Sequence, residues 1–157
     1  MTAPRGGPGV ESLEWDEIGL MWEGLAYSPR AINAATREVT SRYNLGPRGA
    51  WMLNLISLSC VYPLDLAKVF KVGRSLITAE LARLSEAGLI LAEPGADRRR
   101  SRLALTSQGE ATCRKTRLTM LTMARTRLAA YSADEVRLFA KMLHDIRQGS
   151  DETGSES

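Results

Sequence analysis

The sequence predicts a mainly α-helical fold that carries one small β-hairpin. Apolar residues recur at helical spacing through most of the chain between residues 13 and 148. The period changes once, where two short strand-compatible runs flank the turn-forming residues 94–97 (Pro-Gly-Ala-Asp). We therefore expect four helices, a hairpin and two further helices, in that order.

The first predicted helix is long and interrupted. Trp15, Ile18 and Trp22 open it at helical spacing, and Ser28-Pro29 then offers either a new helix start or a kink. Residues 44–47 (Asn-Leu-Gly-Pro) end this region and start the next helix. The inward face of that next helix is predicted to hold Trp51, Met52, Leu55, Ile56 and Ser59.

Two short helices and the hairpin form the centre of the chain. Pro63 opens the first of these helices, residues 71–73 form a tight connection, and Gly88 is expected to cap the second helix. The hairpin strands are predicted over residues 89–93 and 102–105. Two helices joined by a short turn and followed by a hairpin form a winged helix-turn-helix, whose second helix enters the DNA major groove.

The last two predicted helices are amphipathic. Thr106 caps one that contains Leu118 and Leu121, and the residues 132–135 (Ser-Ala-Asp-Glu) form a capping box that opens the other. Their apolar residues, with two near the N-terminus, exceed what isolated helices bury, so we expect helical dimerisation arms, although packing within the chain accounts for some of them. The expected dimerisation residues are Leu13, Trp15, Leu121, Leu128, Phe139, Met142 and Ile146.

These elements predict one continuous folded unit with two tails. The expected segments are a flexible N-terminal tail (1–12), N-terminal dimerisation and effector-pocket helices (13–44), a winged helix-turn-helix DNA-binding domain (45–105), C-terminal dimerisation helices (106–148) and a flexible C-terminal tail (149–157).

Charge is distributed unevenly along the chain. The net charge is +3, but residues 71–127 carry twelve Lys or Arg against five Asp or Glu, which gives 12 − 5 = +7. Such a basic middle is expected either to meet a polyanion or to form an ordinary solvated face. The chain lacks a run of apolar residues long enough for a membrane span and lacks a signal-peptide pattern, so we expect a cytoplasmic protein with no membrane partner.

The candidate DNA-binding residues lie in the second central helix and in the hairpin. Arg74, Ser75 and Thr78 lie opposite Leu76, Ile77 and Leu81, at the helix end that recognition helices turn toward bases and phosphates. Four arginines within five positions at the hairpin tip fit either a narrow minor groove or a solvated loop, and their place after the helix favours DNA. The further candidates are Lys71, Arg98, Arg99, Arg100 and Arg102, with Asp97 expected to orient Arg99.

These residues also resemble the MarR family of transcriptional regulators. Residues 97–99 (Asp-Arg-Arg) followed by 105–109 (Leu-Thr-Ser-Gln-Gly) match the family's wing signature, and the resemblance extends over about residues 15–147. It implies a homodimer that binds a palindromic operator in double-stranded DNA, most often as a repressor, and releases it when a small aromatic or phenolic carboxylate binds. One departure is Ala79, where many members carry a basic residue.

The effector site is predicted only loosely. A pocket needs apolar walls and a few polar anchors. Trp22, Trp51 and Met52 could form pocket walls, but their helical spacing favours packing in the core. Arg30 either binds a carboxylate or pairs with Glu23 or Glu38. The full candidate set is Trp22, Tyr27, Ser28, Arg30, Asn33, Trp51 and Met52.

Other functions receive less support from the sequence. Cys60 and Cys113 are separated and fit buried apolar positions better than redox centres, and with one histidine, His144, they do not make a usual zinc site. We see no phosphate-binding loop, nucleophile elbow or paired carboxylates, so we expect neither an enzyme nor a cofactor. The alternative to a regulator is a winged-helix module for protein contacts or for general coating of DNA, without an effector.

Overall fold

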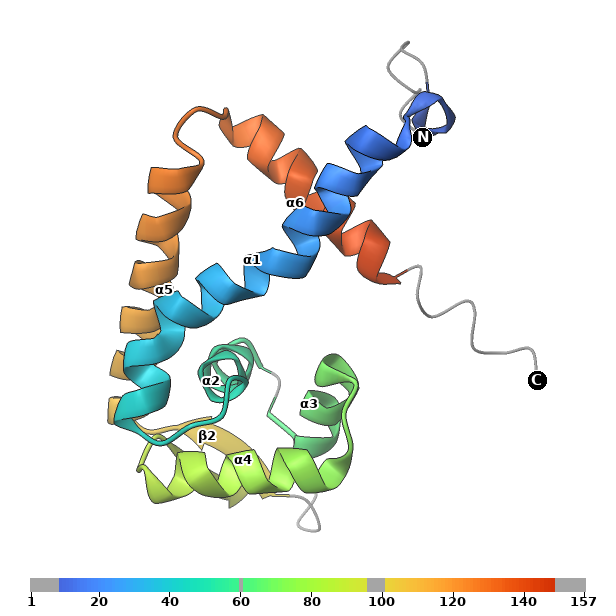
Figure 1. Ribbon diagram of the computed structural model, residues 1–157. Coiled ribbons are helices and arrows are strands. Elements are labelled where there is room, and N and C mark those ends of the chain that lie inside the picture. The colour runs from blue at the N-terminus through green and yellow to red at the C-terminus, as the bar shows by residue number, and fades with distance from the viewer. Residues whose placement is uncertain (1–8, 60, 96–100, 149–157) are drawn as a thin grey trace, which may run out of the picture. The chain divides into compact units, whose positions relative to one another are not determined.

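The computed structural model describes residues 9–59, 61–95 and 101–148. They form two compact units, one made by the described residues up to Thr116 and the other by those from Arg117 onward. Along the chain lie η1 (Val10–Ser12), α1 (Trp15–Arg42), α2 (Gly49–Ser57), α3 (Pro63–Phe70), α4 (Arg74–Glu86), β1 (Ile90–Pro94), β2 (Ser101–Leu105), α5 (Ser107–Arg127) and α6 (Ala133–Gln148) (Figure 1). This order confirms the predicted mainly α-helical fold with one small hairpin.

The helix α1 is continuous from Trp15 to Arg42, so the predicted new helix start at Ser28-Pro29 is wrong. Pro29 lies inside this helix. Proline removes one backbone donor. The hydroxyl of Ser28 donates to the carbonyl of Gly24, one turn earlier, instead of capping a new helix. One helix, α1, therefore runs from near the N-terminus to the connection before α2.

The core-facing stripe of α2 also differs from the prediction. Gly49, Met52, Leu53 and Ile56 are buried, at the spacing of one helix face. Leu53, absent from the predicted face, is fully buried, whereas Trp51 and Leu55 are only partly buried. Ser59 is exposed and lies beyond the end of α2 with a φ of 80°. The helix ends at Ser57, so the predicted face was extended too far.

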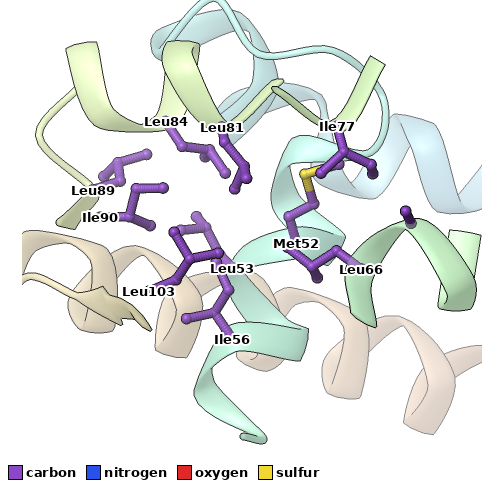
Figure 2. Packing of buried hydrophobic residues seen from close by; sticks show 11 residues of the cluster. Met52, Leu53, Ile56, Leu66, Ile77, Leu81, Leu84, Leu89, Ile90 and Leu103 are labelled. Atoms are coloured by element: carbon purple, nitrogen blue, oxygen red, sulfur yellow. The ribbon is translucent and has the colours of Figure 1, made fainter. Parts of the chain in front are cut away.

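A hydrophobic core packs α2, α3, α4 and the hairpin of the first unit against one another. Figure 2 shows its side chains converging from α2, α3, α4 and the hairpin. Burying each of these large aliphatic groups contributes on the order of 2 kcal/mol. The core residues are Met52, Leu53, Ile56, Leu66, Ala67, Ile77, Leu81, Leu84, Leu89, Ile90 and Leu103.

The hairpin is antiparallel, and Ile90 pairs with Leu105 at its base. Pro94, predicted to belong to the turn, instead pairs with Ser101 as the last residue of β1. Proline is tolerated at this position because the end of an edge strand does not need its missing N–H. The predicted strands are otherwise confirmed to within one residue.

Local signals determine where the chain enters the hairpin, before β1, and where it leaves it, after β2. Gly88 has a φ of +69°, and the Leu89 N–H donates to the Leu84 carbonyl at 3.0 Å, which forms the predicted glycine cap of α4. The Thr106 hydroxyl donates to the Gly88 carbonyl at 2.6 Å and accepts from the Gly109 N–H at 3.0 Å. A Cβ at residue 109 would overlap the Leu89 carbonyl. The Leu-Thr-x-x-Gly pattern therefore joins the hairpin to the start of α5.

The second unit contains the end of α5 and all of α6. The predicted capping box is present, because the Ser132 N–H donates to Glu135 at 2.7 Å and the Glu135 N–H donates to the Ser132 hydroxyl at 3.2 Å. No residue of α6 is buried. Across the described part of the chain, none of the helices combines the length and apolarity that crossing a membrane requires.

Candidate nucleic-acid interface

The helix-turn-helix consists of α3, a three-residue connection and α4. Lys71 adopts a left-handed conformation with a φ of 50°, and the Val72 N–H donates to the Ala67 carbonyl at 3.2 Å. Gly73 is the N-cap of α4 and provides no side-chain cap for the first N–H groups of that helix. The N-terminus of α4 therefore presents backbone donors and a partial positive charge, which favour phosphate.

The predicted contact residues of α4 lie at this end and are exposed. They are Arg74, Ser75 and Thr78. The Thr78 hydroxyl donates to the Arg74 carbonyl at 2.9 Å. Leu76, which the sequence placed with the buried residues, is 43% exposed, because the core-facing stripe runs through Ile77 and Leu81 and leaves position 76 on its flank.

The wing is attached firmly to the same domain. Leu103 of β2 is buried, and its N–H donates to the Val61 carbonyl at 2.8 Å, just before α3. Arg102 is exposed on β2 opposite Glu93 of β1. The other predicted wing residues, Asp97, Arg98, Arg99 and Arg100, lie outside the described residues.

A groove of about 450 Å³ lies between the helix-turn-helix and the wing. Arg74, Ile77 and Thr78 line it from α4, and Ser101 lines it from β2. Pro63, Leu64 and Asp65 line it from the start of α3, and Tyr62 lines it from the position just before that helix. The predicted recognition helix and the turn end of the paired hairpin strands thus border one concave surface.

Glu80 is an important residue that the sequence reading missed. Its side chain is buried on α4, Oε1 accepts from the Gly46 N–H at 2.6 Å, and Oε2 accepts from Arg83 Nη1 at 3.3 Å. A Cβ at Gly49 would approach Oε1 to 2.8 Å. The carboxylate therefore fastens α4 to the connection before α2. The available signal was a charged residue at a core-facing position of α4.

A smaller hollow, of about 190 Å³, lies beside Tyr43 where α1 meets the start of α5. Hydrogen bonds from Thr112 and Gln108 lower the pKa of the Tyr43 phenol, because they stabilise the phenolate. Lys115 pairs with Glu38 and lowers the pKa of that carboxyl by a hydrogen bond and by its charge. The ion pair of Glu38 with Arg30 that the sequence left open is therefore replaced by one with Lys115.

The predicted effector residues do not gather in either of these cavities. Trp22, Ser28 and Asn33 are exposed along α1, and Arg30 lies over the ring of Tyr27 at 4.9 Å. Trp51 is partly buried. Met52 is completely buried in the core, which is the alternative that the sequence favoured for it. Trp22 does not follow that alternative, since it is 47% exposed.

The predicted dimerisation residues are largely exposed. Leu13 and Trp15 are exposed at the start of the first unit, and Leu121, Phe139, Met142 and Ile146 are exposed in the second. Within the second unit Leu128, Phe139 and Met142 help to line an apolar groove of about 420 Å³.

The remaining candidate residues point to no reactive centre among the described residues. Cys113 is buried, with its Sγ 3.8 Å from the hydroxyl of Ser57, and His144 is exposed. Cys60 lies outside the residues that the structure describes. No group of three or more His, Cys, Asp or Glu side chains in the described ranges is arranged to hold a metal ion.

No protein-family model matches the sequence, and no curated protein matches it either. Solved structures do match. A MarR family transcription regulator gives a TM-score of 0.72 at 21% identity, with 90% of this chain and 95% of that chain covered. An organohalide-sensing transcriptional regulator, in its ligand-free form, gives 0.67 at 20% identity over 99% and 94% of the two chains.

The similarity includes a complex with DNA. A mutant of MarR from E. coli complexed with operator DNA gives a TM-score of 0.64 at 22% identity, with 86% of this chain and 99% of that chain covered. The chain has the winged-helix fold of MarR transcriptional regulators. In this MarR fold α3 and α4 form the helix-turn-helix, and β1 and β2 form the wing. The organohalide-sensing regulator has also been solved with 2,4-dichlorophenol bound.

Proposed function

We propose that the protein is a dimeric DNA-binding transcriptional regulator that represses its target genes. The observation that carries this proposal is the exposed N-terminus of α4 next to a wing attached through Leu103 and Val61. Arg74, Ser75 and Thr78 then contact the major groove, Lys71 contacts phosphate, and Arg102 with Arg98, Arg99 and Arg100 follows the minor groove. The operator complex of MarR, which has the same fold, supports this arrangement.

A second copy of the chain is the proposed partner. The helix α6 buries none of its residues, and the apolar groove that includes Leu128, Phe139 and Met142 matches the kind of surface that a homodimer covers. In this proposal segments 13–44 and 106–148 dimerise and segment 45–105 binds DNA. A two-fold symmetric dimer then selects a palindromic operator with half-sites about one helical turn apart.

A small aromatic or phenolic carboxylate is the proposed effector. Support comes from the exposed aromatic side chains of α1, Trp22 and Tyr27, with Ser28, Arg30 and Asn33 nearby on the same helix and Trp51 on α2. A similar regulator binds 2,4-dichlorophenol, which is an aromatic phenol. The test is release of a labelled promoter fragment by a panel of aromatic acids and phenols, and the effector proposal fails if none of them releases it.

Footprinting on the promoter of the protein's own gene tests the DNA-binding proposal. We expect one protected palindrome and an affinity that falls steeply with salt. Uniform coverage with equal affinity for every duplex would instead identify a general DNA-coating protein.

Arginine substitutions then test which surface binds. Arg74→Ala removes a contact worth roughly 1–3 kcal/mol in each half-site, so affinity for the protected palindrome should fall at least tenfold. Arg99→Ala should remove most of the binding by the wing. Arg37→Ala, an exposed arginine of α1, is the matched control and should leave the affinity unchanged. Unchanged affinity in both test variants contradicts the proposed interface.

A further inference from the structure

The exposed surface of α4 carries a row of apolar residues among polar ones. Its core-facing stripe contains Ile77, Glu80, Leu81 and Leu84. Away from that stripe Leu76, Ala79 and Ala82 are exposed at successive intervals of three residues, so that each is a neighbour of the next on the helix surface. The side chains of this apolar row have no group that hydrogen-bonds to a base edge.

Two polar side chains of α4 already form hydrogen bonds within the protein, which reduces the groups that this helix offers to base edges. The Thr78 hydroxyl donates its hydrogen to the Arg74 carbonyl at 2.9 Å, so it offers a base edge only an acceptor. Arg83, whose side chain is half exposed, pairs with the buried Glu80 at 3.3 Å. Arg74 and Ser75 in the first turn supply the main hydrogen-bonding groups of the exposed N-terminal half.

The major groove offers one apolar feature that such a surface recognises. Thymine carries a C5-methyl group there, whereas guanine, cytosine and adenine present donors and acceptors. Covering the exposed Leu76 with a donor or acceptor would desolvate that polar group without giving it a hydrogen bond. Contact with a methyl group instead removes apolar surface of both partners from water.

We propose that α4 reads its DNA site through thymine methyl groups, with Leu76 and Ala79 as the specificity-determining residues. This inference rests on the proposed DNA-binding function and adds the base chemistry of that same site. It places a thymine beneath Leu76 in each half-site, and Arg74 and Ser75 then add hydrogen bonds beside it.

Replacing thymine by deoxyuridine tests the proposal, because it removes only the methyl group and keeps the base pairing. The full chain first selects a duplex from a random pool, and each thymine of that duplex is then replaced in turn. One position in each half-site should weaken binding about fourfold, the value for one buried methyl group, and both together about fifteenfold. Thymines outside the protected region should have no effect.

A Leu76→Ala variant connects the lost methyl group to its protein contact. This variant should bind the thymine duplex several-fold more weakly than the natural chain, and it should no longer distinguish the thymine duplex from the uracil duplex at the sensitive position. Leu58→Ala, the same change at an exposed leucine just after α2, is the matched control and should keep the full thymine preference. Circular dichroism checks that both variants are folded.

The possible outcomes distinguish a failure of the thymine-methyl contacts from a failure of the proposed DNA-binding function. Selective binding that is equally tight for thymine and uracil duplexes overturns the methyl contacts and leaves the regulator intact. A thymine preference that persists in Leu76→Ala overturns the role of this leucine. Failure to select any duplex, together with equal affinity for all duplexes, removes the proposed function and this inference with it.

Discussion

The winged-helix region and α6 are both rich in large apolar residues, but many of those in the winged helix are buried, whereas none in α6 is. Leu66 and Leu84 in the winged helix are completely buried, whereas Phe139 and Met142 of α6 are each 48% exposed. The winged helix therefore encloses its central apolar residues within one chain, while Leu64 and Leu76 remain exposed. The helix α6 presents its apolar residues on a surface, which is why we assign it to contact with a second copy.

The largest expected effect is loss of a core side chain in the winged helix. Leu84→Ala should lower the free energy of unfolding by about 4 kcal/mol, because it leaves a cavity between α4 and the hairpin. Urea denaturation at a fixed protein concentration measures this change. Leu91→Ala, at an exposed position of β1, is the matched control and should cost less than about 1 kcal/mol. Equal losses in the two variants would contradict the buried core.

A charge introduced on α6 tests whether the exposed apolar residues of this helix form the dimer contact. Phe139→Glu should weaken self-association at least about a hundredfold, close to 3 kcal/mol, because a carboxylate would be desolvated in an apolar interface. Sedimentation equilibrium measures the dissociation constant. His144→Glu, on the polar side of α6, should leave that constant nearly unchanged. If Phe139→Glu associates as tightly as the natural chain, α6 does not form the dimer contact.

Removing the buried carboxylate of Glu80 should destabilise the winged helix less than Leu84→Ala does. Glu80→Ala leaves the Gly46 N–H without its acceptor and should cost about 2 kcal/mol of unfolding free energy. Glu80→Gln keeps an acceptor oxygen and should recover at least half of that loss. Thermal unfolding of the three proteins measures the order, and a glutamine variant as unstable as the alanine variant would show that the hydrogen bond to Gly46 contributes nothing.

The smallest effect concerns the capping box of α6. Ser132→Ala removes an N-cap and should destabilise the second unit by about 1 kcal/mol at neutral pH. The backbone and hydroxyl hydrogen bonds of Ser132 lower the pKa of Glu135. A carboxyl with a lowered pKa stabilises the fold at a pH above its unfolded pKa, and this contribution disappears as the pH falls through the folded pKa.

The difference between Ser132→Ala and the natural chain should accordingly shrink between pH 7 and strongly acidic pH. Thermal melts of both proteins over this range measure it. A difference that stays constant with pH would show that the hydroxyl caps the helix without any contribution from the Glu135 charge.

Many helix ends were predictable, in the winged helix and at α6, because their signals are local. The glycine cap at Gly88, the Thr106 cap and the Ser132 capping box each depend on residues within a few positions, and all three are present. The exposure of Arg74 and Ser75 follows from helical periodicity in the same way.

Other features depended on contacts between distant parts of the chain. Proline signals in the sequence favour a helix break, but in α1 the helix continues through Pro29. The position of Leu76 on the flank of α4 follows from which side of the helix packs on α2 and the hairpin. The role of Glu80 depends on Gly46, a residue 34 positions earlier, which no local pattern connects with it.

By itself the sequence determined the order of elements, the helix caps, the hairpin and the basic central region, because short-range hydrogen bonding, periodicity and charge are properties of neighbouring residues. The tertiary structure alone decided which leucines are enclosed and which face outward, where the Glu80 carboxylate binds and how the wing attaches through Leu103 to Val61. These features follow from packing between elements far apart in the chain, and packing is set by shapes that meet only in the folded protein.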